Sequence, residues 1–160
     1  RKQNKIYIFI TFYKFYATVK KLNIIVCLDD NNGMMFNKRR QSQDKLLRVS
    51  IKELVKGKTL FMNEYSYKLY KDINNENIIV SENYLDECEN DNFCLVENKP
   101  LNNYIEKIDN IIIYKWNRIY PSDLYFDVDI KNEQWELIET EEFQGSSHEK
   151  ITKETYRRIK

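Results

Sequence analysis

The sequence is poor in glycine and proline, has a single histidine and contains no CxxC pair. Its 3 glycines leave few places where the backbone can approach a phosphate group closely. Because His148 is the lone histidine and the cysteine spacings do not suit zinc, we expect no bound metal. We expect Cys27, Cys88 and Cys94 to be reduced thiols, with Cys27 a small core residue in an apolar strand.

Neither sign of charge dominates, since 26 basic and 25 acidic residues leave a net charge of +1. That balance provides no overall field to attract nucleic acid or an anionic membrane. Apolar residues make up 42% of the chain and charged residues 32%, which is typical of a globular protein. A chain of 160 residues is long enough for one domain with a substantial core.

Acidic residues are absent from positions 1–21, where Lys and Arg alternate with Ile, Tyr and Phe. The apolar run is broken by Lys14 and is too short to span a bilayer, and only Ala17 suggests a signal-peptide cleavage site. Leu22 stands where translation could start, because a leucine-type codon can serve as an initiator. We expect residues 1–21 to be translated upstream sequence or a weakly structured extension, and residues 22–160 to form the domain.

From residue 22 onward, strand-like stretches alternate with helix-like ones. Apolar, partly β-branched runs predict strands at 23–28, 58–62, 77–81, 92–97, 110–116 and 123–128. Apolar residues at helical spacing and capping residues predict helices at 41–57, 63–72, 83–90 and 99–108, with Asn63 as the N-cap of the second. The segments 133–144 and 151–158 predict a closing antiparallel pair. This order implies an α/β fold with a mostly parallel central sheet and antiparallel C-terminal strands.

The pieces, taken in order, resemble dihydrofolate reductase over nearly all of residues 22–158. IIVCLDDNNGMMF resembles that family's VAVDxNxGIG opening, and GKTLFMNEYSYKLY resembles GKPVIMGRKTYESL. SDLYFDVDIKNEQWELIETEEF resembles GDTYFPEIDxSxWELVxxEEF, and ITKETYRR resembles the final YTFxxYER strand. The resemblance implies a dihydrofolate-reductase-like three-layer fold and reduction of a pterin by NADPH.

A carboxylate in the first helix of that family orients the pterin and assists its protonation, eleven or twelve residues after the loop glycine. Asp44 follows Gly33 by eleven residues, so the resemblance implies that Asp44 is the catalytic carboxylate. The alternative, from the residues themselves, is an Asp at a helix N-terminus placed for the helix dipole, or a solvated charge. Both interpretations stay open.

The resemblance also implies the residues around a substrate and a cofactor. Predicted substrate contacts are Arg39, Arg40, Gln41 and Gln43, where the arginines could hold a carboxylate or phosphate bidentately. Predicted cofactor contacts are Gly33, Ser66, Ser81, Glu97 and Asn98.

Two departures from the family fall on the NADPH contacts. Glu97-Asn98 replaces the glycine pair that lets the backbone meet the pyrophosphate, and Asn63-Glu64 replaces a Gly-Arg pair whose arginine helps hold the phosphates. Each change puts an acidic residue near a position that should attract an anion. Either the chain binds the cofactor through other contacts, or the fold serves another function.

A hydrolase is the least favoured function. His148 lies beside Ser146, Ser147 and Glu149, but adjacency in sequence rarely supplies catalytic geometry, and a polar turn is the simpler interpretation. NNGMMFNKRRQSQD and GSSHEKIT also resemble a short family of clostridia-like bacteria that is often labelled ribonuclease Z. That two-zinc class needs an HxHxDH motif, which this chain lacks.

We therefore expect a bacterial, cytoplasmic protein that acts on a small molecule, as a monomer or weak homodimer, with no nucleic acid or membrane partner. The leading function is a divergent NADPH-dependent reductase of dihydrofolate or a related pterin-like substrate. The alternative is a non-catalytic binding or regulatory protein on the same fold that has lost the NADPH site.

Overall fold

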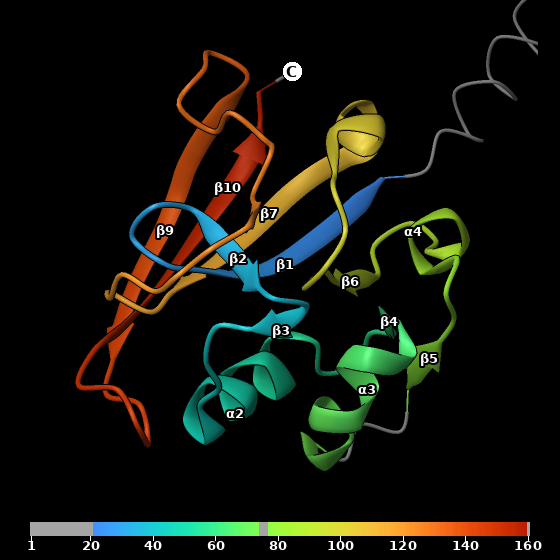
Figure 1. The fold of residues 1–160 in the computed structure, drawn as a ribbon. Coiled ribbons are helices and arrows are strands. Elements are labelled where there is room, and N and C mark those ends of the chain that lie inside the picture. Colours follow the sequence, from blue (N-terminus) through green and yellow to red (C-terminus); the bar gives the residue numbers. More distant parts are fainter. Residues whose placement is uncertain (1–20, 74–76, 160) are drawn as a thin grey trace, which may run out of the picture.

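The computed structural model describes residues 21–73 and 77–159. A seven-stranded sheet has the order β5-β4-β6-β1-β7-β10-β9 (Figure 1). Its strands are β1 (Leu22–Leu28), β4 (Leu60–Met62), β5 (Ile78–Val80), β6 (Phe93–Leu95), β7 (Ile108–Lys115), β9 (Trp135–Phe143) and β10 (Ile151–Arg158). The helices are α2 (Lys45–Leu54), α3 (Glu64–Tyr70) and α4 (Tyr84–Glu87), with 3-10 turns η1 (Lys71–Ile73) and η2 (Asn102–Lys107). Of the predicted N-terminal extension, only Lys21 is within the described ranges.

The strand directions confirm the predicted sheet. β1 pairs in parallel with β6 and β7, and β4 pairs in parallel with β5 and β6. β10 runs antiparallel to both β7 and β9. The carboxyl ends of the five parallel strands therefore meet at one edge of the sheet.

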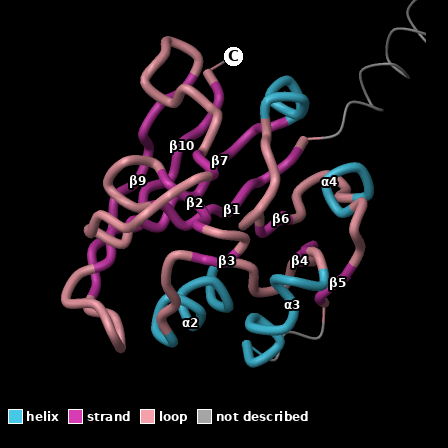
Figure 2. The backbone as a smooth tube through the Cα atoms, viewed as in Figure 1, coloured by secondary structure: helices cyan, strands magenta, loops and turns pink. Residues whose placement is uncertain are grey.

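Both faces of the sheet are covered, which gives the predicted three layers. Along β1, Ile24 and Val26 belong to one core cluster, whereas Ile25 between them belongs to the other, as the two-residue period of a strand requires. The Ile25 face is covered by α2 and α3, through residues such as Leu47 and Ile51 (Figures 1 and 2). The opposite face is covered by α4 and η2.

The segment after β1, expected to be a loop, contains a second, small sheet. Its order is β3-β2-β8, with bounds β2 (Gly33–Phe36), β3 (Arg39–Arg40) and β8 (Leu124–Tyr125). Asn37 and Lys38 form the two-residue turn between β2 and β3, with φ of 50° and 60°. The strand predicted at 123–128 is thus shorter than expected and pairs with β2 instead of joining the large sheet.

The helix predicted at 99–108 is a 3-10 helix that covers Asn102–Lys107 only. Pro100 has no N–H, and the N–H groups of Leu101 and Asn102 donate to the Asp127 carboxylate at 2.8–3.1 Å. The predicted N-cap of α3 is confirmed, since Asn63 Oδ1 accepts from Ser66 N at 3.1 Å.

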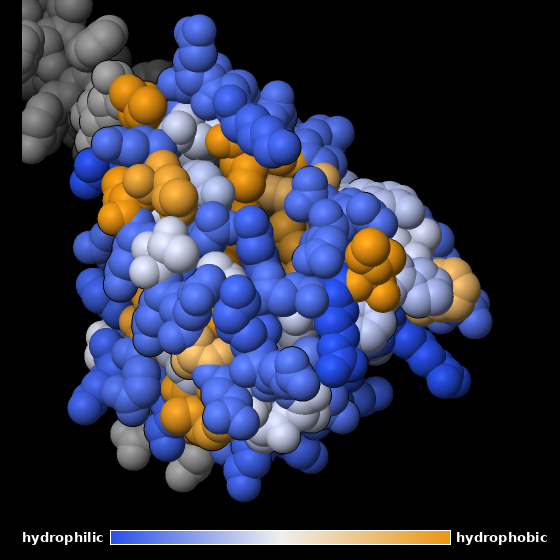
Figure 3. Space-filling model, turned by 90° about the vertical axis from the view of Figure 1, so that its left-hand side faces the viewer, coloured by the Kyte–Doolittle hydropathy of each residue, from blue (hydrophilic) through white to orange (hydrophobic). Residues whose placement is uncertain are grey.

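The surface is mostly polar. The face in Figure 3 is predominantly hydrophilic and carries its apolar groups in separate patches. Among the described residues, no helix has the length and apolar character needed to cross a membrane.

Candidate functional site

Polar residues follow the carboxyl ends of four neighbouring strands of the large sheet. Asp29 follows β1, Asn63 follows β4, and Glu97 lies just beyond β6. Trp116 follows β7 directly. In open α/β sheets, ligands bind outside this edge, so this is where a functional site is expected.

The first buried carboxylate at this edge belongs to Asp29, which is 3% exposed. Five donors surround it at 2.7–3.3 Å: the backbone N–H groups of Asn31, Gly33 and Tyr120, Gln41 Nε2 and Ser122 Oγ. Burial alone would raise the pKa of Asp29, but the N–H groups of Tyr120, Gly33 and Asn31 and the Gln41 amide together lower it. Asp29 therefore joins the first loop to the segment that follows β7.

The second buried carboxylate belongs to Asp44, whose side chain has no exposed area. It is the N-cap of α2. Six donors surround it at 2.9–3.2 Å: the backbone N–H groups of Leu46, Leu47, Ser146 and Ser147, Ser147 Oγ and His148 Nδ1. Burial alone would raise the pKa of Asp44, but the hydrogen bonds from Ser147, His148, Ser146 and Leu47 outweigh it and hold the pKa well below its usual range.

His148 extends the Asp44 network to the edge of the sheet. Its Nδ1 lies 2.9 Å from Asp44 Oδ2, and its Nε2 lies 2.9 Å from Ser42 Oγ and 3.2 Å from the Tyr120 hydroxyl. The imidazole stacks on Trp116, with ring centroids 4.7 Å apart and planes 28° apart. The histidine side chain is 3% exposed, so the packing fixes its orientation.

An ion pair occupies the middle of the site. Arg40 Nε and Nη2 donate to the two carboxylate oxygens of Glu97 at 2.9 and 3.1 Å, a bidentate arrangement. The Arg40 guanidinium also lies 4.5 Å from the centre of the Tyr65 ring. The Glu97 side chain is 9% exposed and that of Arg40 is 24% exposed, so most of this pair is removed from water.

Next to this pair, two amide side chains are hydrogen-bonded to each other at the N-terminus of α3. Asn63 Nδ2 donates to Asn98 Oδ1 at 2.9 Å. The same Asn63 caps the helix through its Oδ1, and Glu64 N donates to Glu82 Oε1 at 3.3 Å. The N–H groups of Glu64 and Ser66 at the start of α3 are thus bonded within the protein, and the acidic residues Glu64 and Glu82 lie at this end of the helix.

The cavity behind the ion pair is very small. Its volume is about 10 Å³, and its lining residues are Cys27, Met34, Arg40, Gln41, Ser42, Glu97 and Trp116. Burial, followed by the charge of Glu97, raises the pKa of the Cys27 thiol to about 12, so this thiol stays protonated. The space is of the order of one water molecule.

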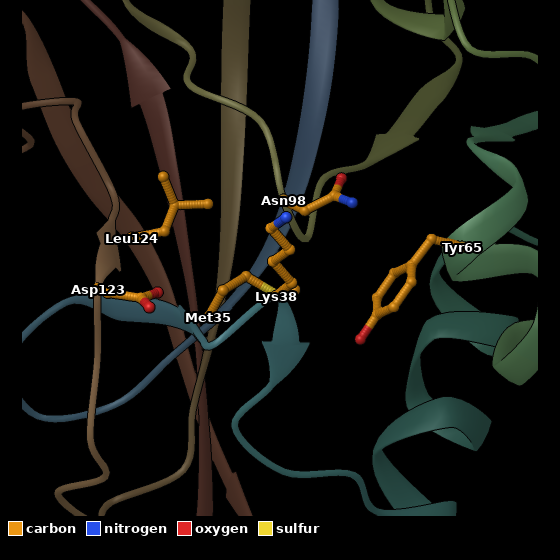
Figure 4. Close-up of a pocket in the computed structure, with 6 residues that line it drawn as sticks. All are labelled: Met35, Lys38, Tyr65, Asn98, Asp123 and Leu124. Atoms are coloured by element: carbon orange, nitrogen blue, oxygen red, sulfur yellow. The ribbon is translucent and has the colours of Figure 1, made fainter.

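A larger pocket includes Tyr65, whose ring contacts the Arg40 guanidinium, in its lining. It has a volume of about 430 Å³ and is lined by Met35, Lys38, Tyr65, Asn98, Asp123 and Leu124 (Figure 4). Apolar groups from Met35 and Leu124 and the Tyr65 ring line it together with one cation, one carboxylate and one amide. This size and mixture are typical of small-molecule pockets.

Among solved structures, the chain is similar to dihydrofolate reductase from Enterococcus faecalis in complex with NADP(H) and RAB-propyl. The match has a TM-score of 0.62 and covers 88% of this chain and 97% of that chain. The fold is dihydrofolate-reductase-like. The identity is 14%, so the likeness shows the fold and nothing finer. No protein-family model and no curated protein sequence matches the chain, and the resemblance to chains labelled ribonuclease Z stays a prediction.

The structure gathers only some of the predicted substrate residues. Arg40 and Gln41 line the small cavity, but Arg40 is paired with Glu97 and the Gln41 amide is bound to Asp29. Arg39 is exposed on β3, and Gln43 is exposed with its Oε1 3.4 Å from Arg48 Nη1. The predicted catalytic role of Asp44 stays a prediction, although its carboxylate is enclosed by donors.

The predicted cofactor residues are also spread out. Gly33 donates its N–H to Asp29, and Ser66 is 1% exposed with a buried hydroxyl that lacks a partner among the described residues. Ser81 Oγ accepts from Asn83 N in the turn after β5. Glu97 and Asn98 reach the sheet edge, each bound to another side chain as described above.

Sequence reasoning missed several residues at this edge. Ser42 and Trp116 both contact His148, and Tyr65 and Lys38 line the larger pocket. A signal existed for Trp116, since it directly follows an apolar strand, but none for Ser42, which lies 106 residues from His148. Within the described ranges, no group of three or more His, Cys, Asp or Glu side chains is arranged to hold a metal ion.

Proposed function

We propose that this chain is a small-molecule-binding protein that has kept the dihydrofolate-reductase-like fold and does not use NADPH. The observation that carries the proposal is the pairing of Glu97 with Arg40 at the position where the family resemblance calls for a glycine pair. A dinucleotide there would bring its pyrophosphate against the Glu97 carboxylate. It would also have to displace the Asn63–Asn98 hydrogen bond.

Charge and geometry both disfavour a pyrophosphate at this edge. An anion close to Glu97 and Glu64 meets like charge in a partly water-excluded cleft. Separating Arg40 from Glu97 would leave two poorly hydrated charges, which costs about 3–5 kcal/mol for a buried pair. The residues present therefore do not fit NADPH, and we derive no hydride transfer through them.

The region where the family resemblance implies a pterin also has little free volume. The cavity next to Arg40, Gln41 and Trp116 has about 10 Å³, whereas ligand pockets hold roughly 300–1,000 Å³. The Asp44 carboxylate, which the reductase function would need free to meet a pterin, has no exposed area. Both observations support binding over reduction.

The pocket of about 430 Å³ is the proposed ligand site. Lys38 supports a binding role because its φ of 60° is unfavourable for a lysine, and strained residues gather at functional sites. Its ammonium group and the Tyr65 ring together suit a small aromatic molecule with a carboxylate. In Figure 4, Lys38 lies between Asp123 and Tyr65.

A titration separates binding from reduction. We would add NADPH up to about 1 mM, the upper end of ordinary KM values, and follow quenching of protein fluorescence and loss of NADPH absorbance with dihydrofolate. A catalytically active dihydrofolate reductase serves as the positive control. We expect neither signal from this chain, and saturable NADPH binding in the micromolar range would contradict the proposal.

The proposed binding of a small molecule in the larger pocket is tested with a separate set of ligands. Benzoate and its small ring-substituted relatives would be titrated while the amide signals of the pocket residues are followed by NMR. We expect Lys38→Gly to weaken the response at least tenfold, and Asn37→Gly to leave it unchanged. Asn37 is a matched control because it belongs to the same turn, also has positive φ and does not line the pocket. Equal responses of the two variants would contradict the assignment of the pocket.

A further inference from the structure

Three side chains far apart in the sequence form a hydrogen-bonded line beside the small cavity. Asp44 Oδ2 lies 2.9 Å from His148 Nδ1, and His148 Nε2 lies 2.9 Å from Ser42 Oγ. A carboxylate, an imidazole and a hydroxyl in this order are the parts of an activated serine, and such sets are recognised by geometry rather than by sequence position.

The carboxylate fixes which imidazole nitrogen carries the proton. Asp44 is ionised, because its hydrogen bonds hold its pKa well below the usual range, and an ionised carboxylate only accepts. The neighbouring Nδ1 therefore donates its N–H to Oδ2. In the neutral imidazole, Nε2 is then an acceptor, and it faces two hydroxyls that can donate to it, that of Ser42 at 2.9 Å and that of Tyr120 at 3.2 Å.

Two further contacts hold the imidazole in place. The Asp44 carboxylate is in direct contact with the ring. Trp116 stacks on the ring face at 4.7 Å, and an aromatic face attracts a cation. The His148 ring is thus held with its Nε2 toward Ser42.

We propose that Ser42 is an activated nucleophile that takes a short acyl group from a carboxylic ester, with His148 as its general base and Asp44 as a positioning residue. The assignment goes beyond the ligand-binding function and does not depend on it. Ser42 is half-buried and lines the small cavity. The neighbouring thiol of Cys27 is protonated, which leaves the serine as the cavity's nucleophile.

The chemistry balances with the ester and water alone. Ser42 Oγ attacks the carbonyl carbon while its proton passes to His148 Nε2. The bond from the carbonyl carbon to the leaving oxygen then breaks, and the alcohol departs with the proton from Nε2. Water repeats the sequence on the acyl-serine and releases a carboxylic acid, which restores the hydroxyl.

The wall of the cavity accounts for a restriction to short acyl groups. Arg40 and Glu97 line the small cavity, and Arg40 also stacks on Tyr65 of the larger pocket. An ester can reach Ser42 only if this ion pair separates, at the same cost that counts against a dinucleotide, but a neutral ester does not meet like charge at Glu97 as a pyrophosphate would.

An active-site phosphonylating reagent tests the nucleophile directly. A small alkyl fluorophosphonate would be incubated with the full chain, followed by intact mass measurement and peptide mapping. Attack by Ser42 Oγ breaks the P–F bond, with fluoride leaving and the proton passing to His148. We expect one adduct, on Ser42, that is lost in Ser42→Ala and retained in Ser146→Ala. The Ser146 hydroxyl accepts from Lys45 N and does not contact His148, so it is a matched control.

A cysteine variant provides a second readout that does not require an ester. In Ser42→Cys, the imidazole would draw the proton from the thiol, and the thiolate would react quickly with iodoacetamide at neutral pH. Ser146→Cys, at an exposed position in contact with the same loop, should react more slowly despite its better access.

Several results would overturn the assignment. They are the absence of a fluorophosphonate adduct on the wild-type chain, an adduct that persists in Ser42→Ala, and slower alkylation of Ser42→Cys than of Ser146→Cys. Circular dichroism of every variant checks that it is folded. Because none of these readouts involves NADPH or benzoate, their failure is distinguishable from failure of the proposed function.

Discussion

Asp29 and Asp44 are two buried carboxylates built in nearly the same way. Each is at most 3% exposed, each joins segments about a hundred residues apart, and each has a lowered pKa. They differ in their side-chain donors. Asp29 accepts from the Gln41 amide and the Ser122 hydroxyl, whereas Asp44 accepts from the Ser147 hydroxyl and His148. A buried, hydrogen-bonded carboxylate therefore joins two segments of the chain at Asp29, whereas at Asp44 it also contacts an imidazole that can carry a proton.

The largest effect is expected from Asp44→Asn compared with Asp29→Asn. An amide at position 44 turns an NH₂ group toward N–H donors and removes the charge opposite His148, so we expect a loss of about 3–5 kcal/mol. Asp29→Asn weakens charge-assisted hydrogen bonds without removing a charge opposite a histidine, so we expect a smaller loss of about 1.5–3 kcal/mol. Urea unfolding measures both. An equal or greater loss at Asp29 would show that the imidazole adds nothing to the Asp44 network.

The next comparison is between substitutions of Gly145, beside Asp44, and Gly33, beside Asp29. A Cβ at Gly145 would clash with Asp44 Oδ2, and one at Gly33 would clash with Ser122 Oγ. Rotation of the Ser122 hydroxyl would not relieve the clash at Gly33, because Ser122 Cβ lies 2.8 Å from the added Cβ, and the Asp44 carboxylate is held by the donors around it. We expect Gly145→Ala and Gly33→Ala each to cost about 2–4 kcal/mol, since large losses need a clash that cannot relax.

Gly57→Ala is the control for these two substitutions. Gly57 has φ of +77°, and nothing lies within 4 Å of the place that an alanine methyl group would take. The cost of this substitution is therefore conformational only, about 1 kcal/mol. Thermal unfolding of the three variants gives the order. A smaller loss for Gly145→Ala than for Gly57→Ala would contradict a rigid carboxylate.

Acid should weaken both networks. Because each carboxylate has a lower pKa folded than unfolded, its contribution is complete above about pH 5 and is lost as the pH falls toward the folded pKa. We expect the free energy of unfolding of the wild type to fall between about pH 5 and about pH 2. The dependence of the free energy of unfolding on pH should become weaker in Asp44→Asn than in Asp29→Asn. Denaturant unfolding at several pH values measures it, and identical slopes would contradict the difference between the two sites.

The sheet could be predicted from the sequence because its signals are local. NIIVCL and NIIIYKW are apolar runs that only a buried strand explains, and they pair in parallel as β1 and β7. Asn63 was predictable as an N-cap for the same reason. The short β2–β3 hairpin was missed, because GMMF follows a polar stretch with a glycine and looks like the end of a loop.

The functional edge was much harder to predict, because its contacts join distant segments. The sequence placed His148 beside Ser146 and Ser147, but its Nε2 meets Ser42, which is 106 residues away. Glu97 was predicted as a misfit beside a phosphate, yet nothing local indicated that Arg40, 57 residues earlier, would pair with it. Such pairings depend on which strands are neighbours in the sheet, and no single segment of the sequence specifies the strand order.

The smallest expected effect concerns the turn that lies between Asp29 and Asp44 in the sequence. Lys38 has φ of 60° at a turn position that favours glycine, whereas Asn37, with φ of 50°, tolerates this conformation well. Lys38→Gly should therefore stabilise the protein by about 0.5–1 kcal/mol, and Asn37→Gly should change it little. Urea unfolding of both variants measures the difference. A gain in stability together with weaker benzoate binding would mean that the strain at Lys38 is kept for the pocket, while a loss of stability would show that its ammonium group supports the hairpin instead.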